Sequence, residues 1–138
     1  MEPSFEVLEH TADAGIVARG PSLESAFEAA AAGMYSLMVD LEGVRELTTR
    51  LVETTGQDPE HLLSNWLLEL LMLTEIENLV FRRFEVRIDR ERLTGSAFGE
   101  ELDLARHEVR GMVKGVTRHM LAVEREQEGY VARVIFDM

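Results

Sequence analysis

The stretch DPEHLLSNWLLELLMLTEIE, residues 58–77, carries the strongest helix signal in the chain. Asp58 followed by Pro59 favours a helix start, because aspartate caps free main-chain N–H groups and proline fits the first turn. Apolar side chains then recur at helical spacing: Leu62 and Leu63, Trp66 and Leu67, Leu70 and Leu71. The sequence therefore predicts a core helix that ends near Glu77.

Upstream of this helix, the sequence predicts two strands, a second helix and a third strand. Phe5–Leu8 and Gly15–Arg19 have the apolar and β-branched character of strands. Ser22 is a suitable N-cap for a helix that we expect to run to about Asp40, because alanines in this segment favour helix. Residues 46–53 are expected to form the third strand.

Downstream of residue 77 the apolar pattern changes to a period of two. Phe84–Asp89 and Thr94–Gly99 are predicted to be consecutive strands. Val113–Arg125 and Tyr130–Asp137 are predicted to form a long hairpin around the connection Glu126–Gly129. Helices early and strands late predict an α+β fold, with two main helices packed on a mostly antiparallel sheet.

Composition points to one compact globular domain. The chain has 138 residues, of which 46% are apolar and 29% charged, so we expect a single domain over residues 1–138. It has no cysteine, which excludes disulfide scaffolds, thiolate zinc sites and cysteine nucleophiles.

The net charge of −12 is too acidic for a protein that grips RNA through its phosphates, and it suits a basic protein partner instead. The first residues lack a basic region followed by an apolar run, so we expect no signal peptide. The apolar stretch Leu62–Leu73 is interrupted by polar residues and is shorter than the roughly 20 residues that a membrane span needs. We expect a cytoplasmic protein that does not bind membranes and does not bind RNA tightly.

Three residues have the chemistry of a functional site. Lys114 is the one lysine among 14 basic residues, and its compact ammonium differs from the broad guanidinium fork of arginine. Asp13 and Asp137 carry oxygen ligands of the kind that Ca²⁺ or Mg²⁺ prefers. The residues alone leave open whether the two aspartates meet, and whether Lys114 is an ordinary surface residue.

The expected hairpin places Lys114 relative to Asp137. If Arg125 pairs with Tyr130, Arg118 lies opposite Asp137, and Lys114, Arg118 and Asp137 share one face. The opposite face then carries the core side chains Val113, Leu121, Val123, Tyr130, Val134 and Phe136, together with Thr117 and His119.

Several short segments, in this order along the chain, resemble the archease family. They are Phe5–Gly15 with its central His10-Thr-Ala-Asp13, Ser22–Phe27, Leu62-Leu63 with Trp66-Leu67, Val113–Thr117 with His119, and the final Val134–Asp137. The resemblance covers essentially the whole chain. It departs at Arg118, where the family usually has an aromatic residue.

The resemblance implies an accessory protein of the tRNA-splicing RNA ligase. That ligase joins 2′,3′-cyclic-phosphate or 3′-phosphate ends to 5′-hydroxyl ends through a histidine guanylylated by GTP. Archeases promote this guanylylation and allow multiple turnover, without catalysis of their own. The family's metal, usually described as calcium, carries over onto Asp13, Asp137 and the terminal Met138, and partner activation onto Lys114, His10 and His119.

Two other functions remain open at this stage. A metal-dependent hydrolase or nucleotide-processing enzyme could use Asp13, Asp137 and Lys114 directly. A chaperone-like module could instead act on several RNA-processing proteins.

Overall fold

The computed structural model describes residues 1–9 and 13–138. The helices are α1 (Leu23–Ser36), α2 (Pro59–Glu77) and the short 3-10 helix η1 (Leu41–Gly43). The strands are β1 (Ser4–Glu9), β2 (Asp13–Gly20), β3 (Thr48–Thr55), β4 (Leu79–Asp89), β5 (Arg92–Glu101), β6 (Gly115–Glu126) and β7 (Gly129–Asp137).

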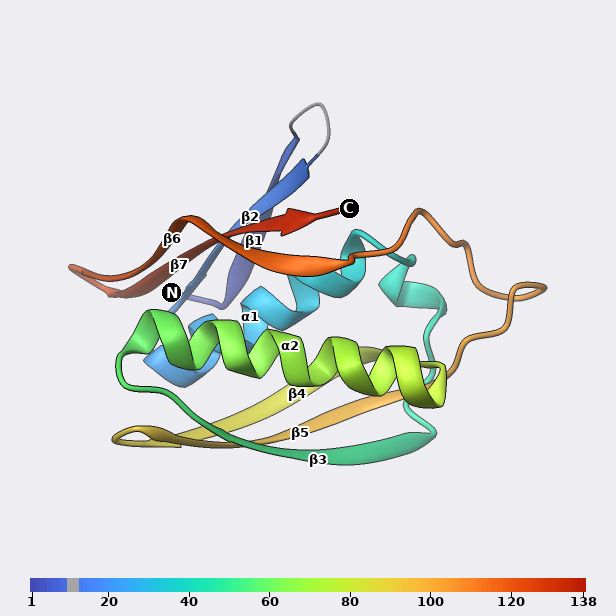
Figure 1. Ribbon diagram of the computed structural model, residues 1–138, viewed down its shortest axis with the longest axis horizontal. Coiled ribbons are helices and arrows are strands. Elements are labelled where there is room, and N and C mark those ends of the chain that lie inside the picture. Colours follow the sequence, from blue (N-terminus) through green and yellow to red (C-terminus); the bar gives the residue numbers. More distant parts are fainter. Residues whose placement is uncertain (10–12) are drawn as a thin grey trace.

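These elements form an α+β fold with two antiparallel sheets, where the sequence predicted one. The four-stranded sheet has the order β1-β2-β7-β6 and the three-stranded sheet the order β3-β5-β4. Figure 1 shows the two helices between the sheets, with β3, β5 and β4 below and the other four strands above. The second sheet was not predicted because β3 pairs with β5, and α2 and β4 separate these strands in the sequence. Local sequence pattern does not encode such a contact.

Helix α1 begins as predicted but ends earlier. Ser22 caps it, accepting a hydrogen bond from the Ser25 N–H at 3.1 Å while the Ser25 hydroxyl accepts one from the Ser22 N–H. The helix stops at Ser36 instead of continuing to about Asp40. Beyond it the chain turns at Leu37 and Met38, and the buried Val39 forms an isolated bridge with Val109.

Helix α2 has the predicted bounds. The Asp58 side chain accepts a hydrogen bond from the His61 N–H at 2.7 Å, and Asn78, in the left-handed region with φ 58°, ends the helix. Trp66 is fully buried and its indole N–H donates to the carbonyl of Phe27 in α1 at 3.2 Å. The prediction that Trp66 belongs to the core is therefore confirmed.

The strands of the second sheet extend beyond the alternating segments. Strand β4 begins at Leu79, before the predicted start at Phe84. The alternating pattern did not indicate this part of the strand, because Leu79, Val80 and Phe81 are all buried. The pairing of β4 with β5 shifts between Phe81 and Arg83. Gly99 of β5 lies against the main chain of Val80 there, where a side chain would collide.

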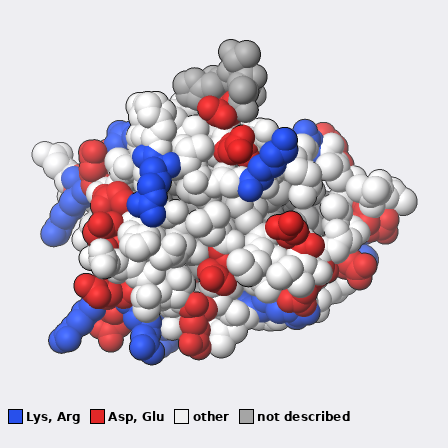
Figure 2. Space-filling model, in the orientation of Figure 1, with Lys and Arg blue, Asp and Glu red and all other residues white. Residues whose placement is uncertain are grey.

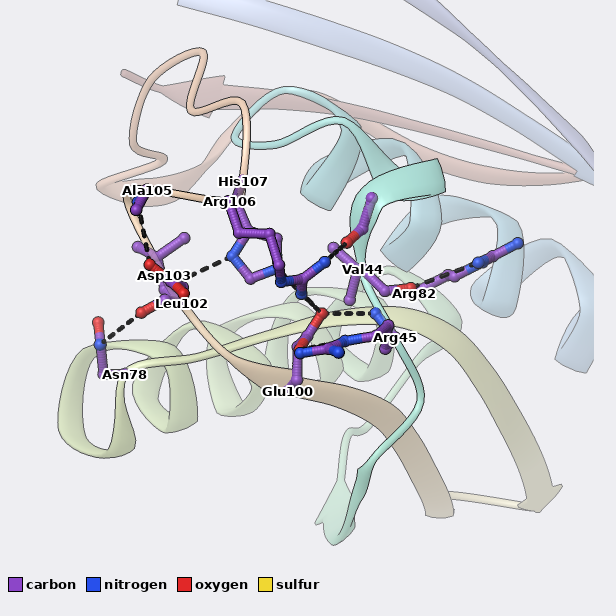
Figure 3. A network of polar contacts seen from close by, with 11 residues as sticks. Val44, Arg45, Asn78, Arg82, Glu100, Leu102, Asp103, Ala105, Arg106 and His107 are labelled. Carbon is purple, nitrogen blue, oxygen red and sulfur yellow. Dashed lines mark hydrogen bonds and ion pairs between the residues drawn. The ribbon is translucent and has the colours of Figure 1, made fainter.

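A buried carboxylate organises the long segment between β5 and β6. Glu100 is 5% exposed, and its carboxylate accepts hydrogen bonds from the Arg45 main-chain N–H at 2.6 Å and from the Arg106 guanidinium (Figure 3). The Nδ1 atom of His107 accepts from the Asp103 N–H at 2.9 Å, which leaves Nε2 to donate to Glu100 at 3.0 Å. Residues 102–107 are thus tied to the end of β5.

These contacts set the titration of Glu100. Burial alone raises the pKa of its carboxyl, but the hydrogen bonds from Arg45, His107 and Arg106 outweigh burial and lower the pKa to about 2. At pH values between about 2 and 4.5, the carboxylate is therefore ionised in the folded protein but mostly protonated in the unfolded chain.

In the described part of the chain, no helix combines the length and apolar character that crossing a membrane requires.

The contact of Gly95 with Trp66 predicts a steric effect on stability. A methyl group at Gly95 would lie 2.6 Å from the buried indole ring, so we expect Gly95→Ala to lower the free energy of unfolding by about 1–3 kcal/mol. Gly43→Ala is the matched control, because no atom lies within 4 Å of the added methyl group. Urea unfolding measures both, and equal stabilities of the two variants would contradict this packing.

The low pKa of Glu100 predicts a dependence of stability on pH. Its stabilising contribution is present above the usual carboxyl pKa of 4.5 and is lost as pH falls toward about 2. Glu100→Gln should therefore melt below the parent protein at pH 7, and the difference should shrink between pH 5 and pH 2.5. The control Glu101→Gln, at an exposed neighbour, should track the parent protein throughout.

Candidate functional site

Asp13 and Asp137 lie directly opposite each other at one end of the four-stranded sheet. Strands β2 and β7 are antiparallel neighbours, and Asp13 pairs with Asp137 in their register. Directly opposed side chains in such a pair lie on the same face, with Cβ atoms about 5 Å apart. Asp13 is half-buried and Asp137 exposed. The structure thus brings together two residues that the sequence left unconnected.

Lys114 approaches Asp137 from the other side. Strand β7 lies between β2 and β6, so Asp137 has a neighbour on each flank: Asp13 in β2 and Gly115 in β6. Lys114 precedes Gly115, is exposed, and donates its main-chain N–H to the carbonyl of Asp137 at 2.7 Å. The pair of aspartates and the single lysine therefore share one end of this sheet.

The predicted register of the last hairpin is correct near the turn and wrong near the site. Arg125 pairs with Tyr130 as expected, and the pairing continues to Ala122 and Arg133. The next pair after Ala122 with Arg133 is Thr117 with Ile135. Between these two pairs, β6 contains three more residues than β7. Met120, within this irregularity, has a φ of 58°.

This shift corrects the predicted position of Arg118. Gly115, and not Arg118, lies opposite Asp137, so the pairing that placed Lys114, Arg118 and Asp137 on one face does not form. Lys114 still reaches Asp137, through its main chain. Residues 118–121 bulge because they have no partners in the ladder.

The core of the hairpin also differs from the expected one. Val113, Val134 and Phe136 are buried as predicted, whereas Leu121, Val123 and Tyr130 are half-buried. His119 is exposed, so the expectation that it points into the core is wrong. Thr117 is half-buried, and its hydroxyl has no hydrogen-bond partner among the described residues. His10 lies outside the described residues.

The donor chemistry of the aspartate pair fits a hard cation. Two like charges in opposed cross-strand positions repel, and a divalent cation would relieve that repulsion. Within residues 1–9 and 13–138, no group of three or more His, Asp or Glu side chains could hold a metal ion. Further ligands would have to be main-chain oxygens or water. Met138 follows Asp137, and its side chain packs against the core, which fixes the main chain beside the pair.

Sequence reasoning missed a hollow that adjoins Lys114. It has a volume of about 360 Å³ and lies between α2 and residues 112–114. Its lining residues come from three distant segments: Met38, then Leu71 and Glu75 in α2, then Met112 and Lys114. No local pattern could have indicated it, because the segments meet only in the folded chain.

Comparisons with known proteins agree with the resemblance seen in the sequence. Residues 5–138 match the model of the Archease protein family (MTH1598/TM1083). The protein archease of Pyrococcus abyssi is 42% identical to this chain over 139 residues, covering 97% of this chain and 98% of the relative. The protein archease of Methanothermobacter thermautotrophicus is 43% identical over 138 residues, with the same coverage.

A solved structure extends the agreement to three dimensions. The solution structure of protein 1598 of Methanobacterium thermoautotrophicum superposes with a TM-score of 0.86 at 43% sequence identity. The match covers 97% of this chain and 98% of that one. On these sequence and structural matches, the chain belongs to the archease family.

Proposed function

We propose that this protein is a cytoplasmic, non-catalytic activator of the GTP-dependent tRNA-splicing RNA ligase. It promotes guanylylation of the ligase and multiple turnover. The observation that carries the proposal is the meeting of Asp13, Asp137 and Lys114 at one sheet end of a chain that belongs to the archease family.

In this proposal, Asp13, Asp137 and main-chain oxygens at Met138 hold the cation, which is calcium or magnesium. Both aspartates point from neighbouring strands to one face, so they can share one ion. When bound, the cation would supply positive charge beside the ligase's nucleotide phosphates. The two carboxylates orient it, and the core contact of Met138 keeps the main-chain oxygens in place.

Lys114 would meet a phosphate or a carboxylate of the partner. Its side chain is exposed, while the hydrogen bond from its main-chain N–H to Asp137 fixes its position next to the aspartate pair. His10 and His119 are assigned to the same partner-facing role by the family resemblance. The exposure of His119, in the bulged part of β6, supports that role.

The direct test is the rate of ligase guanylylation by GTP with and without this protein. We expect acceleration at substoichiometric amounts, and no product from the protein alone with GTP and Ca²⁺ or Mg²⁺. Turnover of GTP by the protein alone would instead support the metal-dependent hydrolase, which could use the same aspartates and lysine. Recovery of several unrelated RNA-processing proteins in a pull-down would support the chaperone-like module.

The aspartate pair predicts a dependence of stability on divalent cations. Millimolar Ca²⁺ or Mg²⁺ should raise the melting temperature relative to chelator, because a ligand that binds only the folded state stabilises it. Asp137→Ala should abolish this rise. In chelator it should be as stable as the parent protein, or more stable by up to ~1 kcal/mol, because the opposed charge is gone.

The exposed Asp89, the last residue of β4, supplies the matched control. Asp89→Ala should keep the full response to cation. A parent protein whose melting temperature is the same in cation and in chelator would remove the support for a metal at this pair.

The position of Lys114 predicts a loss of activation without loss of folding. Lys114→Ala changes an exposed side chain, so the free energy of unfolding should change by less than about 0.5 kcal/mol. Guanylylation of the ligase at saturating activator should nevertheless fall sharply. Lys114→Arg should restore it only in part, because a guanidinium fork does not replace a compact ammonium.

Arg118→Ala is the informative control, since the observed register moves Arg118 away from Asp137. It should activate the ligase nearly as well as the parent protein. Full activation by Lys114→Ala would show that this lysine is an ordinary surface residue with no role in activating the ligase.

A further inference from the structure

Helix α2 carries apolar residues on its exposed side as well as on its core side. Leu63, Trp66, Leu67 and Leu70 are fully buried. On the outer side, Leu68, Met72 and Ile76 follow one another at intervals of four residues and are 41%, 52% and 73% exposed. An amphipathic helix at a protein surface normally presents polar residues there. This row of side chains therefore has the character of an interface.

The exposed row adjoins the hollow described above. Met72 and Ile76 follow directly after Leu71 and Glu75, which line the hollow from α2. The buried Met38 and Val113 form its floor, and the exposed Met112 and Lys114 form its far rim. We call Leu68, Met72, Ile76, Met112 and this hollow the α2 surface. It consists of an apolar strip on the exposed side of α2 and a neighbouring hollow of about 360 Å³.

The charges around the α2 surface indicate the sign of its partner. Helix α2 contains four glutamates and neither lysine nor arginine, so Lys114 on the far rim faces a helix that carries only acidic charge. Glu60 accepts a hydrogen bond from the Val123 N–H, and Glu77 pairs with Arg50. Glu69 and Glu75 form no ion pair with a described residue, and Figure 2 shows a largely uncharged face over α2 with acidic side chains set into it.

The same charges argue against a second copy of this chain as the occupant. Each molecule carries a net charge of −12, so two acidic α2 surfaces would repel each other. A basic segment would instead be attracted over a distance set by the ionic strength. Apolar side chains at helical spacing, flanked by Lys or Arg, complement both the strip and the glutamates.

We propose that the α2 surface docks a basic, amphipathic helical segment of the partner protein, with one of its apolar side chains in the hollow beside Lys114. This inference rests on the proposed function, since it takes the partner to be the RNA ligase. It separates two tasks: the α2 surface supplies affinity, while Asp13, Asp137 and Lys114 act on the ligase once it is bound. Docking into the hollow brings the partner directly against the rim lysine.

The test measures ligase affinity and maximal guanylylation separately. Met72→Ser combined with Ile76→Ser removes exposed apolar groups only, so folding should be retained. We expect the dissociation constant for the ligase to rise at least tenfold, with guanylylation restored at saturating activator. Lys114→Ala should show the reverse pattern, with a large loss of maximal guanylylation and a much smaller change in affinity than the Met72→Ser, Ile76→Ser variant. Glu69→Lys combined with Glu75→Lys should slow association at low salt and have less effect at high salt.

Leu47→Ser combined with Leu104→Ser is the matched control, because these two leucines are also strongly exposed but line a different hollow, which no residue of α2 lines. It should leave affinity unchanged. Methionine oxidation by peroxide gives an independent readout: Met72 and Met112 should be protected in the complex, whereas Met1, also exposed, should not.

The outcomes distinguish the two proposals. A parent protein that neither binds nor accelerates the ligase overturns the proposed function, and this inference with it. A parent protein that accelerates the ligase, together with unchanged affinity of the Met72→Ser, Ile76→Ser variant, overturns only the docking surface. A dimer of this chain that the same variant dissociates would show that a second copy occupies the α2 surface, and would also overturn the proposal.

Discussion

The burial of α1 between two sheets is the constraint on which the rest of the structure depends. Most of its residues are small or apolar and buried, so strands can approach it from opposite sides. Gly33 shows how close this approach is, because a methyl group there would lie 2.9 Å from Ile16 in β2 and 3.1 Å from the Phe5 ring in β1. Tyr35 then fixes α2, donating its buried hydroxyl to the carbonyl of Leu70 at 3.0 Å.

This packing determines where the candidate site forms. With β2 held against α1, β7 pairs beside it, so that Asp13 at the start of β2 lies opposite Asp137 at the end of β7. On the other flank, the segment before β6 is anchored at two points: Glu100 holds His107 and Arg106, and Lys114 bonds the main chain of Asp137. The aspartates and the lysine are thus positioned by main-chain pairing and a buried charge, which leaves their side chains available to ligands.

Local sequence patterns predicted what local physics determines. Ser22 and Asp58 start the two helices as caps, and the last hairpin turns between Glu126 and Gly129. The pairing of β3 with β5 was not predicted, because it joins segments far apart in the chain. The left-handed Met120 and the register shift around it had no signal, since methionine has no preference for positive φ. The pairing of Asp13 with Asp137 also joins segments far apart in the chain, so no local pattern could predict it. Only the family resemblance connected these two residues.

The irregularity of β6 has a consequence for solubility. Strand β6 is the outer strand of its sheet, and a straight outer strand offers a row of free N–H and C=O groups on which another chain could assemble. The additional residues around Met120 bend this row and break its spacing. A second strand could follow β6 for only a few residues before losing its hydrogen bonds, so the bulge protects this edge of the sheet from edge-to-edge aggregation.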